Sequence, residues 1–266
     1  MNKINFRLLY MLLCLWSITC LFNSGVKAQP AGTTNFYSNI KNYNLAPLWR
    51  ADRLRLLSLK QDQPFPEPYG ILGKNNQRFY IHYTSVSKDA GNPYRYNVQG
   101  KTRVGNQVRT FTGTITVKQA GIFKPGENPY APEPFKGYKR GQLICQVALT
   151  EAKTAPGSGT IAGEVTTDFC LNSQNQLLYD TIDFGIDGYG NNKFTGTLKA
   201  LNSKVGQKLQ YGDYSFLDSE FNDVDGITVP PKYEKYGWKS FLDAIPSDVR
   251  PASKAAIAEE KRQWWK

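Results

Sequence analysis

Apolar and polar residues alternate along most of this chain with a period of two. In residues 95–104, Tyr96 and Val98 share one face with small residues, while basic and amide side chains occupy the other face. After a Gly-Asn turn, Phe111 and Ile115 continue the apolar face against a row of threonines. This alternation is typical of half-buried β-strands joined by a hairpin.

The same alternation recurs between clusters of glycine, proline and asparagine. Further strands are predicted at Arg53–Leu59, Arg78–Ser87, Gln142–Glu151, Thr160–Leu171, Leu177–Ile186, Asn192–Leu201 and Lys208–Phe216. Antiparallel strands in this number remove their exposed edges most economically by closing into a barrel. We therefore predict an all-β fold, a single antiparallel β-barrel of about 8–9 strands with a short C-terminal helix.

One short sequence occurs twice. Residues Phe111–Ile115 read Phe-Thr-Gly-Thr-Ile, and residues Phe194–Leu198 read Phe-Thr-Gly-Thr-Leu. The period of two places the first and last residue of each segment on the inner face, together with Gly113 and Gly196. An inward glycine in a strand predicts a bend or a close approach of backbones, as barrel closure requires.

The N-terminus has the layout of a secretory signal. Lys3 and Arg7 give a positive start, about 14 mostly apolar residues follow, and Val26–Ala28 precedes Gln29 with a small final residue. The apolar run is shorter than the roughly 20 residues of a spanning helix. We expect export to the periplasm or the extracellular space, with surface association or lipid attachment at Cys20 as alternatives.

The rest of the chain divides by composition. Residues 29–50 are predicted to be an irregular N-terminal segment after the signal peptide of residues 1–28, and residues 51–240 form the barrel domain. Residues 241–266 form a C-terminal helical tail that contains the most helix-like stretch, rich in Ala, Glu and Lys. A long loop rich in proline and glycine is expected at residues 121–140.

Charge suggests what the protein can contact. The net charge of +11 includes Lys3, Arg7 and Lys27, and no acidic residue precedes Gln29, so the exported part carries +8. A basic exported protein is suited to an anionic membrane surface or an acidic glycan. Basic residues on the solvated faces of strands explain the same charge. Nucleic acid is not expected as a partner, because no Lys/Arg run or nucleic-acid motif occurs.

Two cysteines remain after the signal, Cys145 and Cys170. An oxidising compartment allows them to form a disulfide. The strand pattern opposes this pairing, since Cys145 shares the apolar face of its strand and Cys170 has the opposite parity. A direct bridge therefore needs a bulge or a break in register. Both outcomes remain open at this stage.

Several spaced motifs occur in a characteristic order: Glu67–Gly73, Gln77–Tyr83, Asn92–Tyr94, Gly100–Val104, Phe111–Ile115, Gly190–Thr197 and Tyr211–Tyr214. As a set they resemble a family of uncharacterised exported bacterial proteins, over roughly residues 45–240. The resemblance implies a lipocalin-like (calycin-like) β-barrel. It implies no activity and no catalytic residues. The segment that follows Tyr214 departs from the family's Gly- and Asp-rich run.

Few residues point to catalysis or metal binding. His82 is the only histidine, so a catalytic triad would have to use it and a zinc site would have no second imidazole. The acidic residues 213–225 lack the glycine and glutamate positions of an EF-hand loop. We expect no catalytic residue, no metal site and no cofactor.

Aromatic side chains are the best candidates for ligand contact. Trp49, Tyr69 and Trp238 flank predicted strands, where a flat ring can stack on a sugar or cover an apolar ligand. The leading hypothesis is a non-catalytic exported binding protein for a small apolar or glycan ligand at the barrel mouth. The identity of the ligand and the oligomeric state are not readable from the sequence.

Two further functions remain open. A surface protein–protein interaction or inhibitor protein would use the 121–140 loop and the C-terminal helix. A hydrolase would use paired carboxylates, drawn from Asp180, Asp183 and Asp187 or from Glu151 and Glu164. A filled barrel would favour the interaction protein, and a cleft that holds two carboxylates would favour the hydrolase.

Overall fold

The computed structural model describes residues 29–126, 135–153, 156–223, 226–246 and 251–266. The predicted signal peptide and the centre of the predicted 121–140 loop lie outside these ranges. None of the described helices has the length and hydropathy that a membrane span requires.

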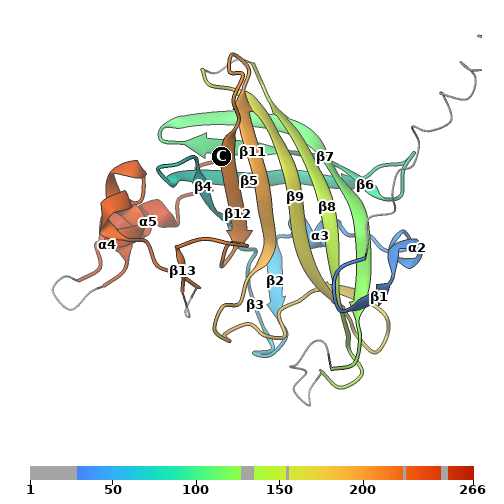
Figure 1. Ribbon diagram of the computed structural model, residues 1–266. Helices are drawn as coiled ribbons and strands as arrows, with labels where there is room; N and C mark the ends of the chain where they lie inside the picture. The colour runs from blue at the N-terminus through green and yellow to red at the C-terminus, as the bar shows by residue number, and fades with distance from the viewer. Residues whose placement is uncertain (1–28, 127–134, 154–155, 224–225, 247–250) are drawn as a thin grey trace, which may run out of the picture.

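Eight antiparallel strands close into a barrel (Figure 1). In chain order they are β4 (Tyr69–Leu72), β5 (Gln77–Lys88), β6 (Arg95–Val104), β7 (Gln107–Phe123), β8 (Lys139–Glu151), β9 (Gly159–Leu171), β11 (Asn191–Ala200) and β12 (Gln207–Asp213). Each strand pairs with the next of this series, and β12 returns to β4 through Leu209 opposite Leu72 and Tyr211 opposite Gly70. The predicted all-β antiparallel barrel is confirmed.

The remaining elements lie outside this circuit. They are β1 (Thr33–Asn35), α2 (Tyr37–Ile40), α3 (Ala46–Trp49), β2 (Arg53–Leu56), β3 (Gln61–Pro64), β10 (Leu177–Tyr179), β13 (Asn222–Asp223), β14 (Gly226–Ile227), η2 (Pro231–Tyr236), α4 (Lys239–Ala244) and α5 (Lys254–Glu260). The strand predicted from Arg53 pairs with β3 in a separate hairpin, so the barrel itself begins only at Tyr69.

Apolar side chains fill the barrel. Phe111 and Phe194 are 2% and 0% exposed, and the ring of Phe194 stacks on Tyr211 with centroids 4.4 Å apart. Ile115 and Leu198 are buried in the same cluster. A barrel of eight strands has an interior just wide enough for side chains to fill. The interior is therefore a packed core and leaves little room for an apolar ligand.

Glycines allow neighbouring strands to approach closely. A β-carbon at Gly113 would collide with the backbone oxygen of Ala148, and one at Gly196 would collide with that of Ala162. These are the central residues of the two repeated segments. The close backbone approach predicted from the repeat is present in both strands.

The N-terminal segment closes one end of the barrel. The indole Nε1 of Trp49 donates a hydrogen bond to Oγ1 of Thr167 at 3.0 Å, and the backbone N–H of Leu45 donates to the Tyr96 hydroxyl at 2.9 Å. Both acceptors lie on the inner face of the wall. Residues 29–50 are thus not wholly irregular: they contain β1, α2 and α3, because their apolar side chains complete the barrel core.

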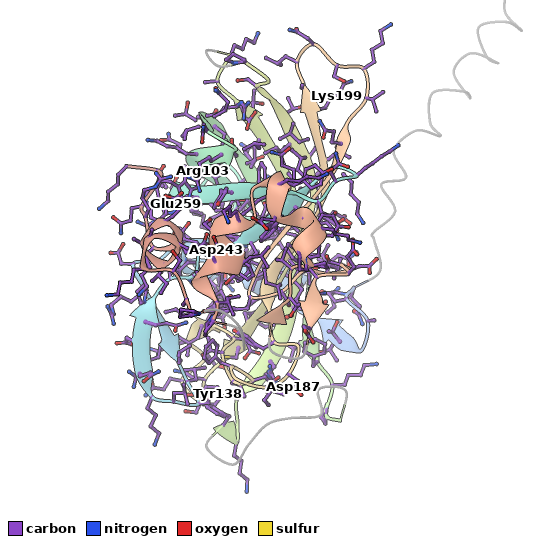
Figure 2. The ribbon with its side chains drawn as sticks, turned by 90° about the vertical axis from the view of Figure 1, so that its left-hand side faces the viewer. Arg103, Tyr138, Asp187, Lys199, Asp243 and Glu259 are labelled. Carbon is purple, nitrogen blue, oxygen red and sulfur yellow. The ribbon has the colours of Figure 1, made fainter. Side chains whose placement is uncertain are left out.

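The C-terminal segment packs on the outside of the barrel, over β5 and β6. Arg78 makes two hydrogen bonds to the carboxylate of Glu260, at 2.7 and 2.5 Å. Arg103 pairs with Glu259 at 3.0 Å, and Figure 2 shows these two side chains beside each other. Arg103 belongs to the basic face that the alternation in residues 95–104 places outside the barrel. It does lie on the outer face, but this tail buries it to 7% exposure.

The two cysteines are free and lie on opposite faces of the wall. Cys145 pairs in register with Val165 and belongs to the interior core, whereas Cys170 pairs with Arg140 and packs outside with Ile182. Five residues of register separate them, roughly 16 Å at about 3.3 Å per residue. A disulfide needs Cα atoms within about 7 Å. The two cysteines therefore form no disulfide, and the strand parity that opposed the pairing is the reason.

Reducing agents are expected to leave the stability of this protein unchanged. A disulfide closing this loop would contribute roughly 3 kcal/mol to the free energy of unfolding. We expect the same urea midpoint with and without dithiothreitol. Alkylation of the denatured, unreduced protein should label both Cys145 and Cys170, as seen by mass spectrometry. A fall in midpoint on reduction, with unlabelled thiols, would contradict the arrangement.

Candidate functional site

The three aromatic residues predicted to bind a ligand do not form one site. Trp49 is 5% exposed inside the end of the barrel, in the cluster that fills the interior. Tyr69 and Trp238 belong to a second apolar cluster between the outer wall and the C-terminal segment. The barrel wall thus separates Trp49 from the other two.

Trp238 is fully buried. Its Nε1 donates a hydrogen bond to the backbone oxygen of Asn76 at 2.8 Å, and its ring meets Phe221 and Phe241 edge-on at 5.4 and 5.6 Å. Tyr69 meets Phe241 in the same way at 5.7 Å. These contacts occupy the faces that would stack on a ligand, so both rings hold the C-terminal segment against the barrel.

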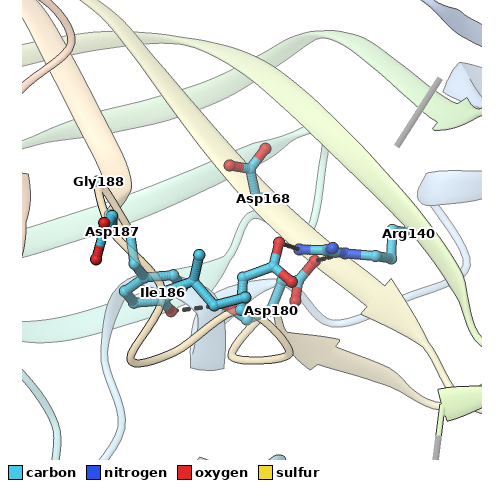
Figure 3. A pocket seen from close by; sticks show the side chains of 9 residues that line it. Arg140, Asp168, Asp180, Ile186, Asp187 and Gly188 are labelled. Carbon is cyan, nitrogen blue, oxygen red and sulfur yellow. Dashed lines mark hydrogen bonds and ion pairs between the residues drawn. The ribbon is translucent and has the colours of Figure 1, made fainter. Parts of the chain in front are cut away.

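A polar pocket lies on the outer face of β8 and β9, at the end of the barrel that the N-terminal segment closes. Its volume is about 220 Å³. Figure 3 shows the side chains that line it. Its walls come from β8, β9 and the connection between β10 and β11. The lining residues are Arg140, Asp168, Asp180, Asp183, Ile186, Asp187, Gly188, Tyr189 and Gly190. We call this hollow the acidic pocket, because four carboxylates line it.

Arg140 organises one side of the acidic pocket. Its Nε donates to Oδ2 of Asp180 at 2.6 Å, and its Nη2 lies 2.7 Å from Oδ2 of Asp183. Asp180 is 3% exposed, so this pair is shielded from water. Opposite charges strengthen such hydrogen bonds. Arg140 therefore fixes both carboxylates in position.

Burial shifts the acid–base behaviour of two carboxyl groups here. Desolvation raises the pKa of Asp168 and of Asp180 above the usual range, although Arg140 opposes the shift in both. Asp168 also accepts a hydrogen bond from the Gln142 amide at 2.9 Å. Burial lowers the pKa of the neighbouring Lys193, and Asp168 opposes that shift.

Local turns bring the other acidic residues to the pocket. Oδ1 of Asp180 accepts a hydrogen bond from the backbone N–H of Ile182 at 3.0 Å, which starts the turn. The chain then reverses repeatedly, and Gly185 and Gly188 adopt φ angles of 90° and 75° that other residues disfavour. The Tyr189 hydroxyl closes the segment by donating to the backbone oxygen of Asp180 at 2.7 Å.

The sequence identified part of this group. Asp180, Asp183 and Asp187 were proposed as paired acids, and all three line the pocket. The other proposed pair, Glu151 and Glu164, does not line this pocket. Glu151 is buried inside the barrel, where it accepts hydrogen bonds from Thr102 and from the backbone N–H of Gly159.

Sequence reasoning missed Arg140 and Asp168. The signal that could have found them is strand parity, because both residues lie on the outer face of adjacent strands. Asp168 is opposite Gln142 in the register, two residues from Arg140. Only the register of β8 against β9 shows that these two polar positions are neighbours.

The single histidine, His82, contacts an acidic residue and a tryptophan. Nδ1 of His82 lies 2.9 Å from a carboxylate oxygen of Glu67, and the ring stacks on Trp265 with centroids 4.0 Å apart. Within the described ranges, no three His, Cys, Asp or Glu side chains are arranged to hold a metal ion.

A second hollow of about 480 Å³ lies beside α2, between β1 and the start of β8. Phe36 and Tyr43 contribute rings to its wall, but these rings also pack on each other at 6.0 Å, and Phe36 packs on Phe169 at 6.3 Å. The aromatic faces are thus used by the core.

Comparison with known proteins adds no assignment. No protein-family model matches the chain, no curated protein is similar to it, and no solved structure matches it. The likeness to an exported bacterial family therefore stays a prediction beyond its barrel fold, and the function must be argued from the site.

Proposed function

We propose that this chain is an exported, non-catalytic binding protein and that the acidic pocket takes a hydroxyl-rich ligand, a unit of a glycan. The observation that carries the proposal is a single hollow lined by four carboxylates, two of which Arg140 holds in place. The four are Asp168, Asp180, Asp183 and Asp187. Carboxylates accept hydrogen bonds from sugar hydroxyl groups, and hydrogen bonds to charged acceptors are the stronger kind.

The packed interior argues against the apolar ligand that the sequence also allowed. Inward rings such as Phe194 and Phe169 are 0% exposed, so they contact neither bulk water nor an enclosed void. A ligand must therefore bind outside the core. The acidic pocket is polar, and its size suits a single sugar unit rather than a lipid chain.

The charge of the acidic pocket limits the chemical class of the ligand further. Four carboxylates and one arginine line the pocket, with Lys193 beside Asp168, so the pocket is negative in a protein whose net charge is +11. A phosphorylated or sulfated sugar would be repelled. A neutral sugar fits, and an amino group on it would gain a favourable charge interaction.

A substitution in the pocket tests the proposal. Asp187 is exposed and lines the pocket, so Asp187→Asn should preserve the fold and weaken binding roughly tenfold by removing a charged acceptor. Neutral, amino and sulfated glycans would be screened on an array, and the affinity of the retained glycan measured by calorimetry. Asp218→Asn removes an equal charge from an exposed position away from the pocket and should leave the affinity unchanged.

Two outcomes would count against the proposal. In the first, the intact protein retains no neutral or amino glycan. In the second, Asp187→Asn and Asp218→Asn reduce affinity equally, which would make the interaction a matter of overall charge rather than of the pocket.

A hydrolase is the second candidate, favoured by one observation. Asp180 is buried and Asp168 is half-buried, and desolvation raises the pKa of both carboxyl groups, a property of general acids in glycoside hydrolysis. The ion pair with Arg140 opposes this role for Asp180, since it stabilises the charged form. Incubation of each bound glycan with the protein separates the two functions: release of shorter sugars, abolished by Asp168→Asn, would establish the hydrolase.

The remaining alternative was a surface protein–protein interaction through the 121–140 loop and the C-terminal helix. The packed interior of the barrel favours this function, but the surface of the helix does not. The described part of that helix packs on the barrel, and Trp264 at its end is 8% exposed beside Tyr80. Its large apolar side chains are thus already used within the chain, which leaves this function with less support than glycan binding.

A further inference from the structure

We infer that the end of the barrel opposite the acidic pocket docks on an anionic lipid membrane. The surface consists of the β11–β12 hairpin tip, residues 199–208, together with Lys153, which follows the end of the neighbouring β8; we call it the basic tip. Figure 1 shows this hairpin projecting beyond the wall, and Figure 2 shows Lys199 and Asp187 at opposite ends of the molecule.

Two large apolar side chains project from the basic tip. Val205 is 75% exposed and Leu201 is 46% exposed, in a chain whose other apolar residues mostly fill three clusters. The tip is nonetheless ordered by hydrogen bonds. The Leu201 N–H donates to the Ser158 backbone oxygen at 2.9 Å, and the Ser203 hydroxyl donates to the Val205 backbone oxygen at 2.8 Å. The fold therefore presents these apolar groups to the outside.

Lysines surround the apolar residues. Lys199, Lys204 and Lys208 are all exposed in the hairpin, and Lys153 is exposed in the neighbouring turn. Among the described residues of the two connections and their adjoining strand ends, Glu151 is the nearest acid, and it is 1% exposed and hydrogen-bonded inside the barrel. The described residues of the two connections thus hold no exposed acid, and Glu220, beside Asn76 in the nearby β4–β5 turn, already pairs with Lys232.

Apolar side chains with lysines around them are complementary to a membrane surface, which has an acyl-chain layer beneath a layer of headgroups. Valine and leucine enter the boundary between headgroups and acyl chains, while lysines interact with anionic headgroups. A soluble polyanion such as a nucleic acid would use the lysines but not the apolar tip, and the tip has no aromatic ring for base stacking. The combination of the two layers therefore favours a membrane.

Vesicle binding tests the inference directly. The full exported chain would be sedimented with vesicles of phosphatidylcholine alone or mixed with phosphatidylglycerol. Binding only to the anionic vesicles is expected. Each lysine contributes about fivefold to partition, so Lys199→Gln, Lys204→Gln and Lys208→Gln together should weaken binding about a hundredfold. The matched control removes Lys118, Lys124 and Lys139, three exposed lysines at the other end of the barrel, and should bind nearly as well as the wild type.

A second measurement separates a membrane from any other polyanion. Cys145 and Cys170 are buried, so Val205→Cys provides one accessible thiol for an environment-sensitive dye. Anionic vesicles should shift the dye emission to the blue, and heparin in solution should not. The same dye on Lys118→Cys should show no shift with either. Leu201→Ser with Val205→Ser should weaken vesicle binding roughly tenfold or more without affecting heparin binding.

Three results would overturn the inference. They are no preference for anionic vesicles, an equal loss of binding in both triple-lysine variants, and binding that is insensitive to the serine substitutions. The last result, with unchanged heparin binding, would assign the tip to a soluble polyanion. None of these results depends on the acidic pocket, so the inference stands or fails separately from glycan binding.

Discussion

Replacing Trp238 by alanine is expected to lower the free energy of unfolding by about 3–5 kcal/mol, as for other fully buried aromatic residues. Trp238 is 0% exposed, and its ring lies between Phe221 and Phe241, with the Arg78 guanidinium 4.9 Å from its centroid. Alanine would leave a cavity and would also free the Asn76 oxygen that the indole N–H now satisfies. Urea unfolding followed by circular dichroism measures the loss.

Two further variants serve as controls for the stability loss expected of Trp238→Ala. Trp238→Phe keeps an aromatic ring but loses the hydrogen bond to Asn76, so its loss should be well below that of alanine. Trp265→Ala removes a tryptophan stacked on His82 near the end of the chain and should cost less. A stable Trp238→Ala variant that no longer bound glycan would restore the ligand-binding role predicted from sequence.

The barrel could be predicted because its signal is local and repeated. A period of two requires only that one face of a strand be buried, and a register slip of one residue would expose every apolar side chain. The pattern that placed Phe111 and Phe194 inside therefore also fixed their neighbours. Both residues lie in the interior core.

The roles of single aromatic residues could not be predicted in this way. Trp49 lies inside the barrel because residues 36–49 fold back into its end, and Trp238 is covered because the segment after β12 returns to the outer wall. Each placement depends on contacts between distant parts of the chain. The local sequence around a tryptophan that flanks a strand is the same whether the folded chain buries its side chain or leaves it exposed.

The acidic pocket also combines residues that the local sequence could group with residues that only the fold brings together. Asp180, Asp183 and Asp187 are close in the chain, so they could be proposed together from their spacing alone. Arg140 and Asp168 come from two strands, and only the pairing of those strands brings them to the pocket. The alternation of side chains between the two faces of a strand places Cys145 and Cys170 on opposite faces. The same alternation places Arg140 and Asp168 together on the outer face.

A buried carboxyl group in the barrel leads to the second large expected effect. Asp213 is 1% exposed, and its Oδ2 accepts hydrogen bonds from the Tyr179 hydroxyl at 2.8 Å and the Asn192 amide at 2.7 Å. Its Oδ1 has no hydrogen-bond partner among the described residues. Burial raises the pKa of Asp213 to about 7, although both hydrogen bonds oppose the shift.

Stability is therefore expected to fall as the pH rises from about 4 to about 7 through the titration of Asp213. In this window the folded protein keeps a proton that the unfolded chain has already released, so each step upward in pH favours unfolding. Below the window both states are protonated and the group contributes nothing. Above it, the buried charge costs roughly 4 kcal/mol, three units at about 1.4 kcal/mol each.

Asp213→Asn should remove this dependence, because an amide occupies the same space without titrating. Urea unfolding of the wild type and the variant at pH 5 and pH 8 isolates the effect, since Asp168 and Asp180 titrate in both proteins. Relative to the wild type, the variant should gain about 3 kcal/mol between the two pH values, two units at about 1.4 kcal/mol each. Asp218→Asn, at an exposed position, should gain nothing. A difference between wild type and Asp213→Asn that does not change with pH would show that Asp213 is already ionised in the folded protein at pH 5.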